Sequence, residues 1–395
     1  MSRFNLKIKQ SSNKYLSPWK ISYILDNLTS EYYKKYVLDQ LTEKLEDLPE
    51  TQIPIIFNGS FDLYNQYSKL KNFNINNRTD TENFYYLGDL VSLKPNIKIK
   101  KIELIFKLHR DLYSSLKKID IKMDRSKILD YIWPNFNINE EINLENLLEY
   151  IILLLGKDND KLKTEIHKKI DKTKKEFDIF LDNLINFKLI DEMNEKEFDE
   201  FLKNPANKNF VNKYYNAFFD TYIRYSRPII AIFDTEKGTL NILAIEFIKE
   251  SLLEGNSEKI EIKEISKNSP TLMDIMVGYI AIGFLANTIL LGLGLRKNRL
   301  EKQSQKNDGS DKEVIAQEVI NLREAMSGIE KFTHENKFNK YIVNIEDYKI
   351  KRNLKKVNNN INDKIIETLD KNEFLNPNVK ITTVENPSGE QPDSE

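Results

Sequence analysis

The sequence predicts an α+β protein that is predominantly helical, has small sheets and contains one hydrophobic, transmembrane helix. Three observations indicate this fold class. Several short segments alternate apolar and polar residues, as half-buried strands do. Longer segments repeat apolar residues every three to four positions, which is typical of amphipathic helices. The segment from Asp274 to Arg299 is almost free of charge, in a chain whose residues are 31% charged.

In the first third of the chain, residues 4–10 alternate and predict a strand. Ser17 suits the N-cap of a helix and Pro18 suits its first position, because proline has no amide hydrogen to lose there. We expect this helical region to run to residue 48, with a break near residues 27–30.

The next two segments are apolar. Residues 53–57 predict a short strand closed by an Asn-Gly turn. Residues 96–108 alternate with a slip of one residue, which a β-bulge would absorb, so we interpret them as a strand. A helix that begins near Ile102 is the alternative.

From residue 143 to residue 225 the periodicity is helical almost throughout, and residues 161–190 predict one long charged helix. An aromatic stripe follows it. Such a stripe could stack nucleic-acid bases, but at helical spacing it is more often part of a core. The stripe comprises Tyr214, Tyr215, Phe218, Phe219, Tyr222 and Tyr225.

Residues 228–233 predict a strand and residues 234–238 a turn. Residues 239–255 are compatible with a hairpin partner or with a helix, and residues 258–266 alternate as a strand does. If the middle element is helical, the three elements form a right-handed βαβ unit.

Beyond the hydrophobic segment, a capping box opens a helix over residues 310–326 that is expected to stop at Gly328. Weaker signals indicate a strand at residues 341–345 and a helix at residues 362–369. Residues 381–395 are acidic and rich in Pro, Gly and Ser, which predicts disorder.

The hydrophobic segment has the caps of a continuous helix, with Ser269 at the N-cap and Pro270 after it. Its uncharged part, residues 275–295, would span roughly 31 Å at about 1.5 Å per residue. A bilayer core is roughly 30 Å thick, so we predict a transmembrane helix over residues 269–297. The alternative is a central helix buried in the core of a soluble protein.

One side of this predicted helix carries small and polar residues. Such stripes let helices approach closely in a membrane, and a buried asparagine seeks a partner across the interface. We therefore expect self-association into a homo-oligomer. The candidate packing residues are Tyr279, Gly283, Ala286, Asn287 and Gly294.

The orientation signals conflict. Three lysines lie in the twenty residues before the segment and six basic residues in the twenty after it, which favours a cytoplasmic C-terminal side. The large N-terminal region has no signal peptide and should itself be cytoplasmic. We expect a single-pass membrane protein with a cytoplasmic N-terminal region. A helix that inserts only when triggered would remove the conflict.

Composition excludes several classes of function. Lys+Arg 60 against Asp+Glu 61 gives no basic surplus, so we expect no nucleic-acid partner unless binding is local. Cysteine is absent and the three histidines are far apart, so we expect no metal site and no cofactor. The abundance of Asn, Lys and Ile is typical of low-GC bacteria.

Two motifs resemble catalytic sequences. Residues 109–112 read HRDL, as in a kinase catalytic loop, but the other kinase motifs are missing. Asp234, with Glu261 and Lys263 on a later strand, has the form of a metal-dependent nuclease core. Charged residues on alternating strands produce such patterns by chance, so neither motif identifies a catalytic residue.

The sequence thus predicts a membrane-anchored bacterial protein that is not an enzyme. Its N-terminal part would bind or sense an unknown protein partner, and its helix would associate with the bilayer and with itself. In one version of this hypothesis the associated helices disrupt the membrane. The alternative is a soluble metal-dependent enzyme that processes nucleic acid. The expected regions are 1–140 (mixed α/β), 141–268 (helical, ending in a small sheet), 269–297 (transmembrane), 298–380 (α+β) and 381–395 (disordered).

Overall fold

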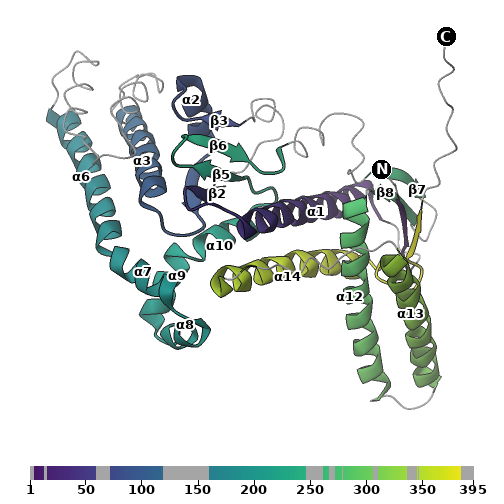
Figure 1. Cartoon of the computed structure of the whole chain (residues 1–395). Coiled ribbons are helices and arrows are strands. Elements are labelled where there is room, and N and C mark those ends of the chain that lie inside the picture. The colour runs from purple at the N-terminus through teal and green to yellow at the C-terminus, as the bar shows by residue number, and fades with distance from the viewer. Residues whose placement is uncertain are drawn as a thin grey trace, which may run out of the picture. The chain divides into compact units, whose positions relative to one another are not determined.

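The computed structural model describes ten stretches of the chain and separates them into two compact units (Figure 1). The described residues are 4–12, 16–58, 72–118, 160–245, 261–266, 272–277, 279–305, 310–335, 345 and 347–383. Most of them are helical and both sheets are antiparallel, which confirms the predicted α+β class.

Neither unit is a continuous stretch of sequence. Unit 1 comprises Met1–Leu38, Glu246–Val343 and Asn358–Glu395, and unit 2 comprises Asp39–Ile245 and Asn344–Val357. The division therefore falls inside α1 (Pro18–Glu46) and inside α14 (Tyr348–Lys371), so each of these helices contributes residues to both units.

Unit 1 contains a four-stranded antiparallel sheet in the order β7-β8-β1-β9. Phe4, Leu6 and Ile8 of β1 are buried on one face, as their alternation predicts. On the other face Lys7 pairs with Asp274 of β8, with 3.3 Å between Nζ and Oδ2. The strands are β1 (Phe4–Lys9), β7 (Glu261–Ser266), β8 (Leu272–Val277) and β9 (Lys380–Thr383).

The position of β8 overturns the predicted transmembrane helix. Residues 272–277 pair with β1 and β7, and helix α12 (Tyr279–Ser304) starts only after them. Its uncharged part, residues 279–295, is roughly 25 Å long at about 1.5 Å per residue, shorter than a bilayer core of roughly 30 Å. In the described part of the chain no helix combines the length and the apolar character needed to cross a membrane. The predicted single-pass membrane localisation is therefore wrong.

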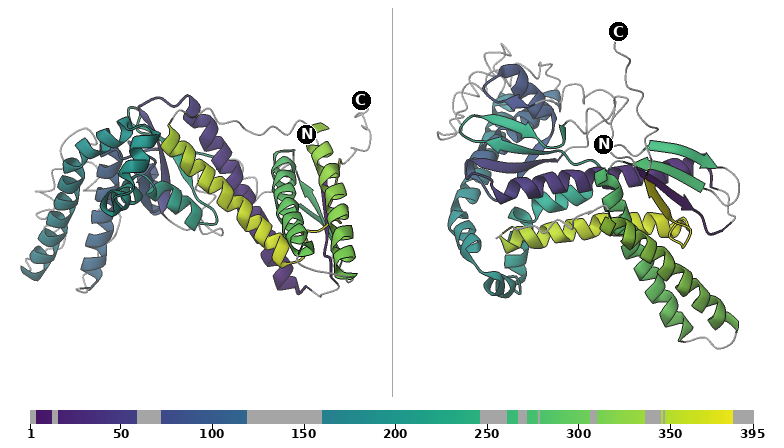
Figure 2. Two further views of the ribbon diagram at one scale, coloured as in Figure 1. Left: turned by 90° about the horizontal axis from the view of Figure 1, so that it is seen from below. Right: turned by 45° about the vertical axis from the view of Figure 1, so that its right-hand side comes forward.

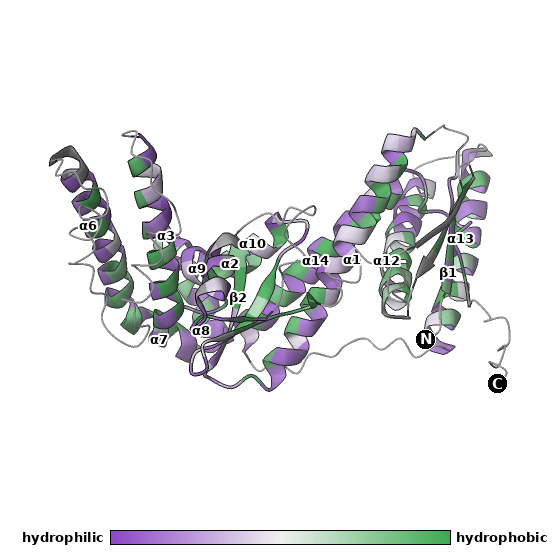
Figure 3. Cartoon of the chain, turned by 90° about the horizontal axis from the view of Figure 1, so that it is seen from above, coloured by the Kyte–Doolittle hydropathy of each residue, from purple (hydrophilic) through white to green (hydrophobic). Residues whose placement is uncertain are grey.

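In unit 1, α12 packs along α13 (Ser310–Glu335), and the two helices lie side by side in both views of Figure 2. Figure 3 shows hydrophilic and hydrophobic residues mixed along α13. The helix continues past Gly328, where we expected it to stop, and Phe332 then packs edge-to-face on Phe4 of β1 with centroids 5.7 Å apart. The extra turns thus place the half-buried Phe332 against the sheet.

Helix α1 is also longer and more regular than predicted. Ser17 is its N-cap, as expected, and its hydroxyl accepts from the Lys20 amide at 3.3 Å. The predicted break at residues 27–30 is absent. Buried residues such as Leu28 continue the packed face through that segment, and one turn later Tyr32 stacks on Phe284 of α12.

Unit 2 contains a five-stranded antiparallel sheet in the order β3-β6-β5-β2-β4. Strands β5 and β6 form a hairpin, so the hairpin alternative is confirmed and the βαβ alternative is wrong. Gly238 closes the turn with a φ of +65°, which a residue with a side chain rarely adopts. The strands are β2 (Gln52–Asn58), β3 (Phe73–Asn74), β4 (Asp89–Ser92), β5 (Ile230–Asp234) and β6 (Thr239–Ile242).

Residues 97–118 form a helix, α3 (Ile97–Lys118), although we interpreted their first part as a strand. Asn96 caps it, since its side-chain oxygen accepts from the amides of Lys98 and Ile99. The alternation of apolar residues also fits a helix whose buried positions recur every three to four residues. Phe106 packs on Phe84 of α2 (Arg78–Tyr86), with ring centroids 5.2 Å apart.

The predicted long helix over residues 161–190 is interrupted. It consists of α6 (Asp160–Asp182) and α7 (Leu184–Glu192), which meet at Asn183. Together with α8 (Glu195–Phe201) and α9 (Pro205–Tyr214), these helices bury an aromatic cluster. Tyr215 belongs to that cluster, and α10 (Ala217–Arg224) buries Phe218, Phe219 and Tyr222. These four residues of the aromatic stripe are core, and Tyr214 and Tyr225 are half-buried.

Several predictions lie outside the described residues. They concern the helical signal at residues 143–156, residues 246–255, the caps Ser269 and Pro270, most of the strand at residues 341–345, and residues 384–395 of the tail. Residues 381–383, which we predicted to be disordered, belong to strand β9.

Candidate interaction surfaces

The outer face of α12 is the first candidate surface. Leu291 and Leu295 are 54% and 47% exposed. Asn287, one turn earlier, is half-buried and donates from Nδ2 to the carbonyl of Gly283 at 2.8 Å. Residues four apart in a helix lie above one another, so Asn287, Leu291 and Leu295 form one stripe, which we name the α12 outer face.

The other residues predicted for helix packing occupy different positions. Gly283 and Ala286 are buried within unit 1. Gly294 is half-buried beside α13, where a Cβ would lie 3.7 Å from Met326. Tyr279 begins the helix, and its side chain is outside the described part. The five predicted residues therefore do not form one surface, and Asn287 alone of the four described side chains lies on the outer face.

The basic residues after the apolar part of α12 make intramolecular contacts, although the sequence assigned them to the edge of a membrane. Arg296 donates to the Leu375 carbonyl at 2.8 Å and to Glu318 of α13 at 2.7 Å. Arg299 pairs with Asp370 of α14 at 3.0 Å. These contacts tie the second half of α12 to its neighbours in unit 1.

Unit 1 also contains a buried cluster of charge. The Lys34 side chain is 1% exposed, and its Nζ lies 3.2 Å from Oε1 of Glu31. The same carboxylate oxygen lies 3.4 Å from Nζ of Lys364 on α14. Burial lowers the pKa of Lys34 to about 8, against the opposing effect of the Glu31 carboxylate. The Glu31 carboxylate thus pairs with two ammonium groups, those of Lys34 and Lys364.

In unit 2 the first half of α14 is attached through polar contacts along one face. Arg352 and Asn353 lie three and four residues after Lys349, and Lys356 lies four and three residues after them, so the four residues share one side of the helix. Lys349 Nζ donates to the Asp191 carbonyl at 3.1 Å, Arg352 to Asp199 at 2.6 Å, Asn353 to Asn216 at 3.1 Å and Lys356 to Asp220 at 3.4 Å.

Lys349 is the buried anchor of this face. Its ammonium lies 5.8 Å and 5.4 Å from the ring centroids of Phe198 and Tyr348. Burial lowers the pKa of Lys349 and raises the pKa of Asp191, whose carbonyl accepts from it. Because the lysine meets a carbonyl, two rings and nearby carboxylates, its contacts fix the first turn of α14.

Asp347 caps the same helix. Its carboxylate accepts from the amides of Lys349 and Ile350 and lies 2.6 Å from Nζ of Lys94. Burial alone would raise the pKa of Asp347, but the contacts with Lys94 outweigh it and lower that pKa. We did not predict this attachment from the sequence. The available signal was residues 349–356, KIKRNLKK, where five of eight residues are basic and none is acidic.

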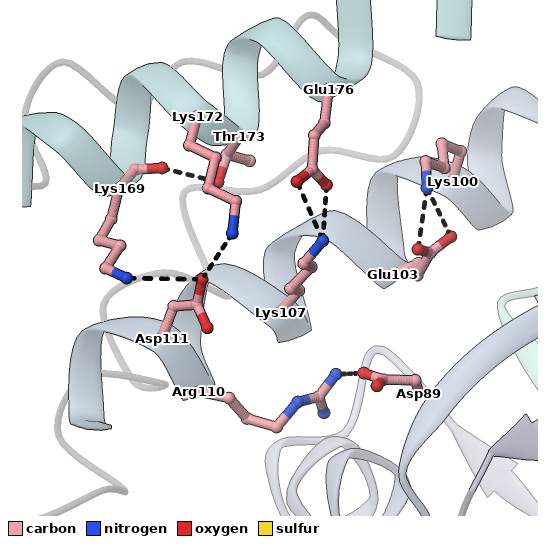
Figure 4. A network of polar contacts seen from close by, with 10 residues as sticks. All are labelled: Asp89, Lys100, Glu103, Lys107, Arg110, Asp111, Lys169, Lys172, Thr173 and Glu176. Atoms are coloured by element: carbon pink, nitrogen blue, oxygen red, sulfur yellow. Dashed lines mark hydrogen bonds and ion pairs between the residues drawn. The ribbon is translucent and has the colours of Figure 1, made fainter. Parts of the chain in front are cut away.

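A second polar network joins α3 to α6 (Figure 4). Lys107 of α3 lies 2.7 Å from Glu176, and Asp111 lies 3.9 Å and 3.7 Å from Lys169 and Lys172. The lysines of α6 are thus partly neutralised by α3, in addition to the acidic residues of α6 itself. We interpret this network as the attachment between two helices.

The HRDL motif lies in the interior of α3, so its residues are not in a catalytic loop. His109 is 1% exposed and packs edge-to-face on Tyr85 with centroids 4.6 Å apart. Arg110 pairs with Asp89 and lies over the Tyr85 ring at 5.3 Å. The motif serves helix packing here, as its chance origin predicts.

The members of the alternative nuclease site lie in different sheets. Asp234 ends β5 in unit 2, and Glu261 begins β7 in unit 1. The Asp234 carboxylate accepts from the amides of Glu236 and Lys237 at 3.1 Å and 3.0 Å, and the Lys237 amide lowers the pKa of that carboxyl. Asp234 therefore stabilises the hairpin turn. The described residues contain no group of three acidic or histidine side chains placed to hold a metal.

Comparison with family models, with curated proteins and with solved structures found no match to the chain. Two exposed helix surfaces are the candidates for function, the α12 outer face in unit 1 and the first half of α14 in unit 2.

Proposed function

We propose that the chain is a partner-binding protein that self-associates through the α12 outer face. The observation that carries the proposal is the exposure of Leu291 and Leu295 on adjacent turns of α12, at 54% and 47%. Single exposed leucines are common on protein surfaces, but these two are aligned on one stripe with an amide before them. We infer that a second copy of the chain binds to this stripe.

The pattern of the stripe suits two copies related by a two-fold axis. Asn287 lies one turn before Leu291, and the exposed Asn298 lies about one turn after Leu295. Antiparallel pairing of two α12 helices would place leucine against leucine at the centre and amide near amide at both ends. An isologous interface requires this kind of self-complementarity. Because the stripe is narrow, we expect a weak dimer that forms with increasing concentration.

The test is the molar mass of the full chain in solution, measured by light scattering across a concentration series. We expect the parent chain to shift toward dimer, and the double variant Leu291→Asp/Leu295→Asp to stay monomeric, because four buried carboxylates would repel at the two-fold axis. Ile320→Asp is the matched control, since Ile320 on α13 is also 47% exposed. A parent that remains monomeric, or equal loss of dimer in the control, contradicts the proposal.

A further inference from the structure

The first half of α14 presents a row of exposed basic side chains. Lys351, Arg352, Lys355 and Lys356 are all exposed, and we name these four residues the basic ridge. Lys351 lies four residues before Lys355, and Arg352 four residues before Lys356. The ridge therefore consists of two short columns, each with two cations one helical turn apart.

The ridge residues have weak partners or none among the described residues. Lys351 and Lys355 make no ion pair there. Arg352 and Lys356 pair with Asp199 and Asp220, but all four of these side chains are 47% to 60% exposed. Exposed ion pairs contribute roughly 0 to 1 kcal/mol each, so another anion can replace those carboxylates. The buried Lys349 is separate from them and keeps the helix in place.

The basic ridge differs from the other lysine-rich surface of unit 2. On α6 acidic residues are interleaved with the lysines, and Lys169 and Lys172 face Asp111. Residues 349–356 contain no acidic residue that could neutralise the ridge from its own helix. Of these two lysine-rich surfaces, the ridge is the one that a local anionic partner fits better, in a chain whose net charge is -1.

We propose that the basic ridge binds an acidic helical segment of a partner protein. Carboxylates one turn apart on such a segment would match each column of cations, as charged pairs do between the helices of a coiled coil. Nucleic acid fits less well, because the ridge has only four cations and belongs to a chain whose net charge is -1, which gives no basic surplus for a continuous phosphate backbone. The inference extends the partner-binding part of the proposed function and uses no residue of the α12 outer face.

The test is fluorescence anisotropy of the full chain with a labelled, alanine-based helical peptide that carries glutamates at i and i+4. We expect saturable binding that weakens at least about tenfold in Lys351→Glu/Lys355→Glu, because two attractive contacts become repulsive. The matched control is Lys174→Glu/Lys175→Glu on α6, which changes the net charge equally at two exposed lysines. We expect the control to bind like the parent chain.

Three outcomes would overturn the proposal. They are no binding of the peptide, equal weakening in both charge-reversal variants, and tighter binding of a short DNA duplex that only the ridge variant loses. The Leu291→Asp/Leu295→Asp variant separates this inference from self-association. If that variant is monomeric and still binds the peptide, the ridge acts independently of the α12 outer face.

Discussion

The two halves of α14 are held in different ways. The first half, in unit 2, is attached by exposed ion pairs, such as that between Arg352 and Asp199, and by one buried lysine. The second half, in unit 1, buries Ile361 and Ile365, and its Asn362 accepts from the hydroxyl of Thr288 at 3.0 Å. One continuous helix thus combines an electrostatic attachment with a close-packed one.

The two halves differ in how exposed their charged side chains are. We expect this exposure, rather than the number of charges, to decide how much an ion pair contributes to the free energy of unfolding. Water and salt screen the pairs of the first half. In the second half Lys364 reaches the carboxylate of Glu31, which is 8% exposed and also holds the buried Lys34. Removing one member of such a buried group leaves the others without compensation. Substitution of a charged residue should therefore lower the free energy of unfolding strongly at the buried group of unit 1 and only slightly at the exposed pairs of unit 2.

The largest loss of stability is expected for the substitution Glu31→Gln. It leaves the ammonium of Lys34 buried without its carboxylate, which should lower the free energy of unfolding by about 3 kcal/mol. The pKa of Lys34 is already lowered to about 8 by burial, and loss of Glu31 should lower it further. A lysine whose folded pKa lies below its unfolded pKa costs stability while it is protonated. The deficit of the variant should therefore shrink as the pH rises toward 8.

Urea unfolding at several pH values measures this deficit. The double variant Glu31→Gln/Lys34→Met is the control, because it removes the buried ammonium together with the carboxylate and should recover part of the loss. If Glu31→Gln lowers the free energy of unfolding less than removal of an exposed ion pair in unit 2 does, the distinction between the two halves of α14 is wrong.

An intermediate effect is expected for Gly292→Val in α12. A Cβ at Gly292 would lie 2.7 Å from Cδ2 of Leu375 and 3.3 Å from Cγ1 of Ile366 on α14. Leu375, which follows α14, and Ile366 would have to shift to make room for the larger side chain, and we expect the free energy of unfolding to fall by about 1 to 3 kcal/mol. Gly328→Ala on α13 is the control, because nothing lies within 4 Å of its Cβ position, and it should raise stability by about 0.5 to 1 kcal/mol. Thermal unfolding of the two variants measures both changes in stability. Equal changes would show that the packing around Gly292 is loose.

Local sequence patterns correctly predicted those elements whose packing in the fold favours the same secondary structure as their own residues do. The alternation of residues 4–10 predicted β1, and Ser17 with Pro18 predicted the start of α1. The turn at residues 234–238 is closed by Asp234 and Gly238, both residues with a strong local preference. In each case the local chemistry and the final packing favour the same structure.

Prediction failed where an apolar pattern fits two structures. The apolar pattern of residues 272–277 fits a helix as well as a strand, and their pairing with β7 and β1 decides between the two. The pairing with β1 joins residues about 270 positions apart in sequence, which no local pattern reveals. The same long-range pairing shortens the apolar part of α12 and removes the membrane span. For α3 the deciding contact was the packing of Phe106 on Phe84.

The candidate surfaces were predicted only in part. Asn287 was assigned to a packing stripe from its spacing, but which side of α12 remains exposed depends on α13 and α14, and so could not be read from the sequence. The basic ridge was visible as a composition, KIKRNLKK. Its significance depends on which lysines find carboxylates in the fold, and Asp199 and Asp220 lie more than 130 residues away in sequence.

The smallest effect is expected for Asp199→Asn, which removes the partner of Arg352 in the first half of α14. Since both side chains are more than half exposed, the loss of stability should stay below about 1 kcal/mol. Raising the NaCl concentration to about 1 M shortens the screening length to about 3 Å and should remove even this difference. Denaturant unfolding at low and high salt measures both values, with Asp178→Asn on the exposed side of α6 as the control. A loss that persists in high salt would mean that the geometry of the hydrogen bond, and not the charge, attaches this half of the helix.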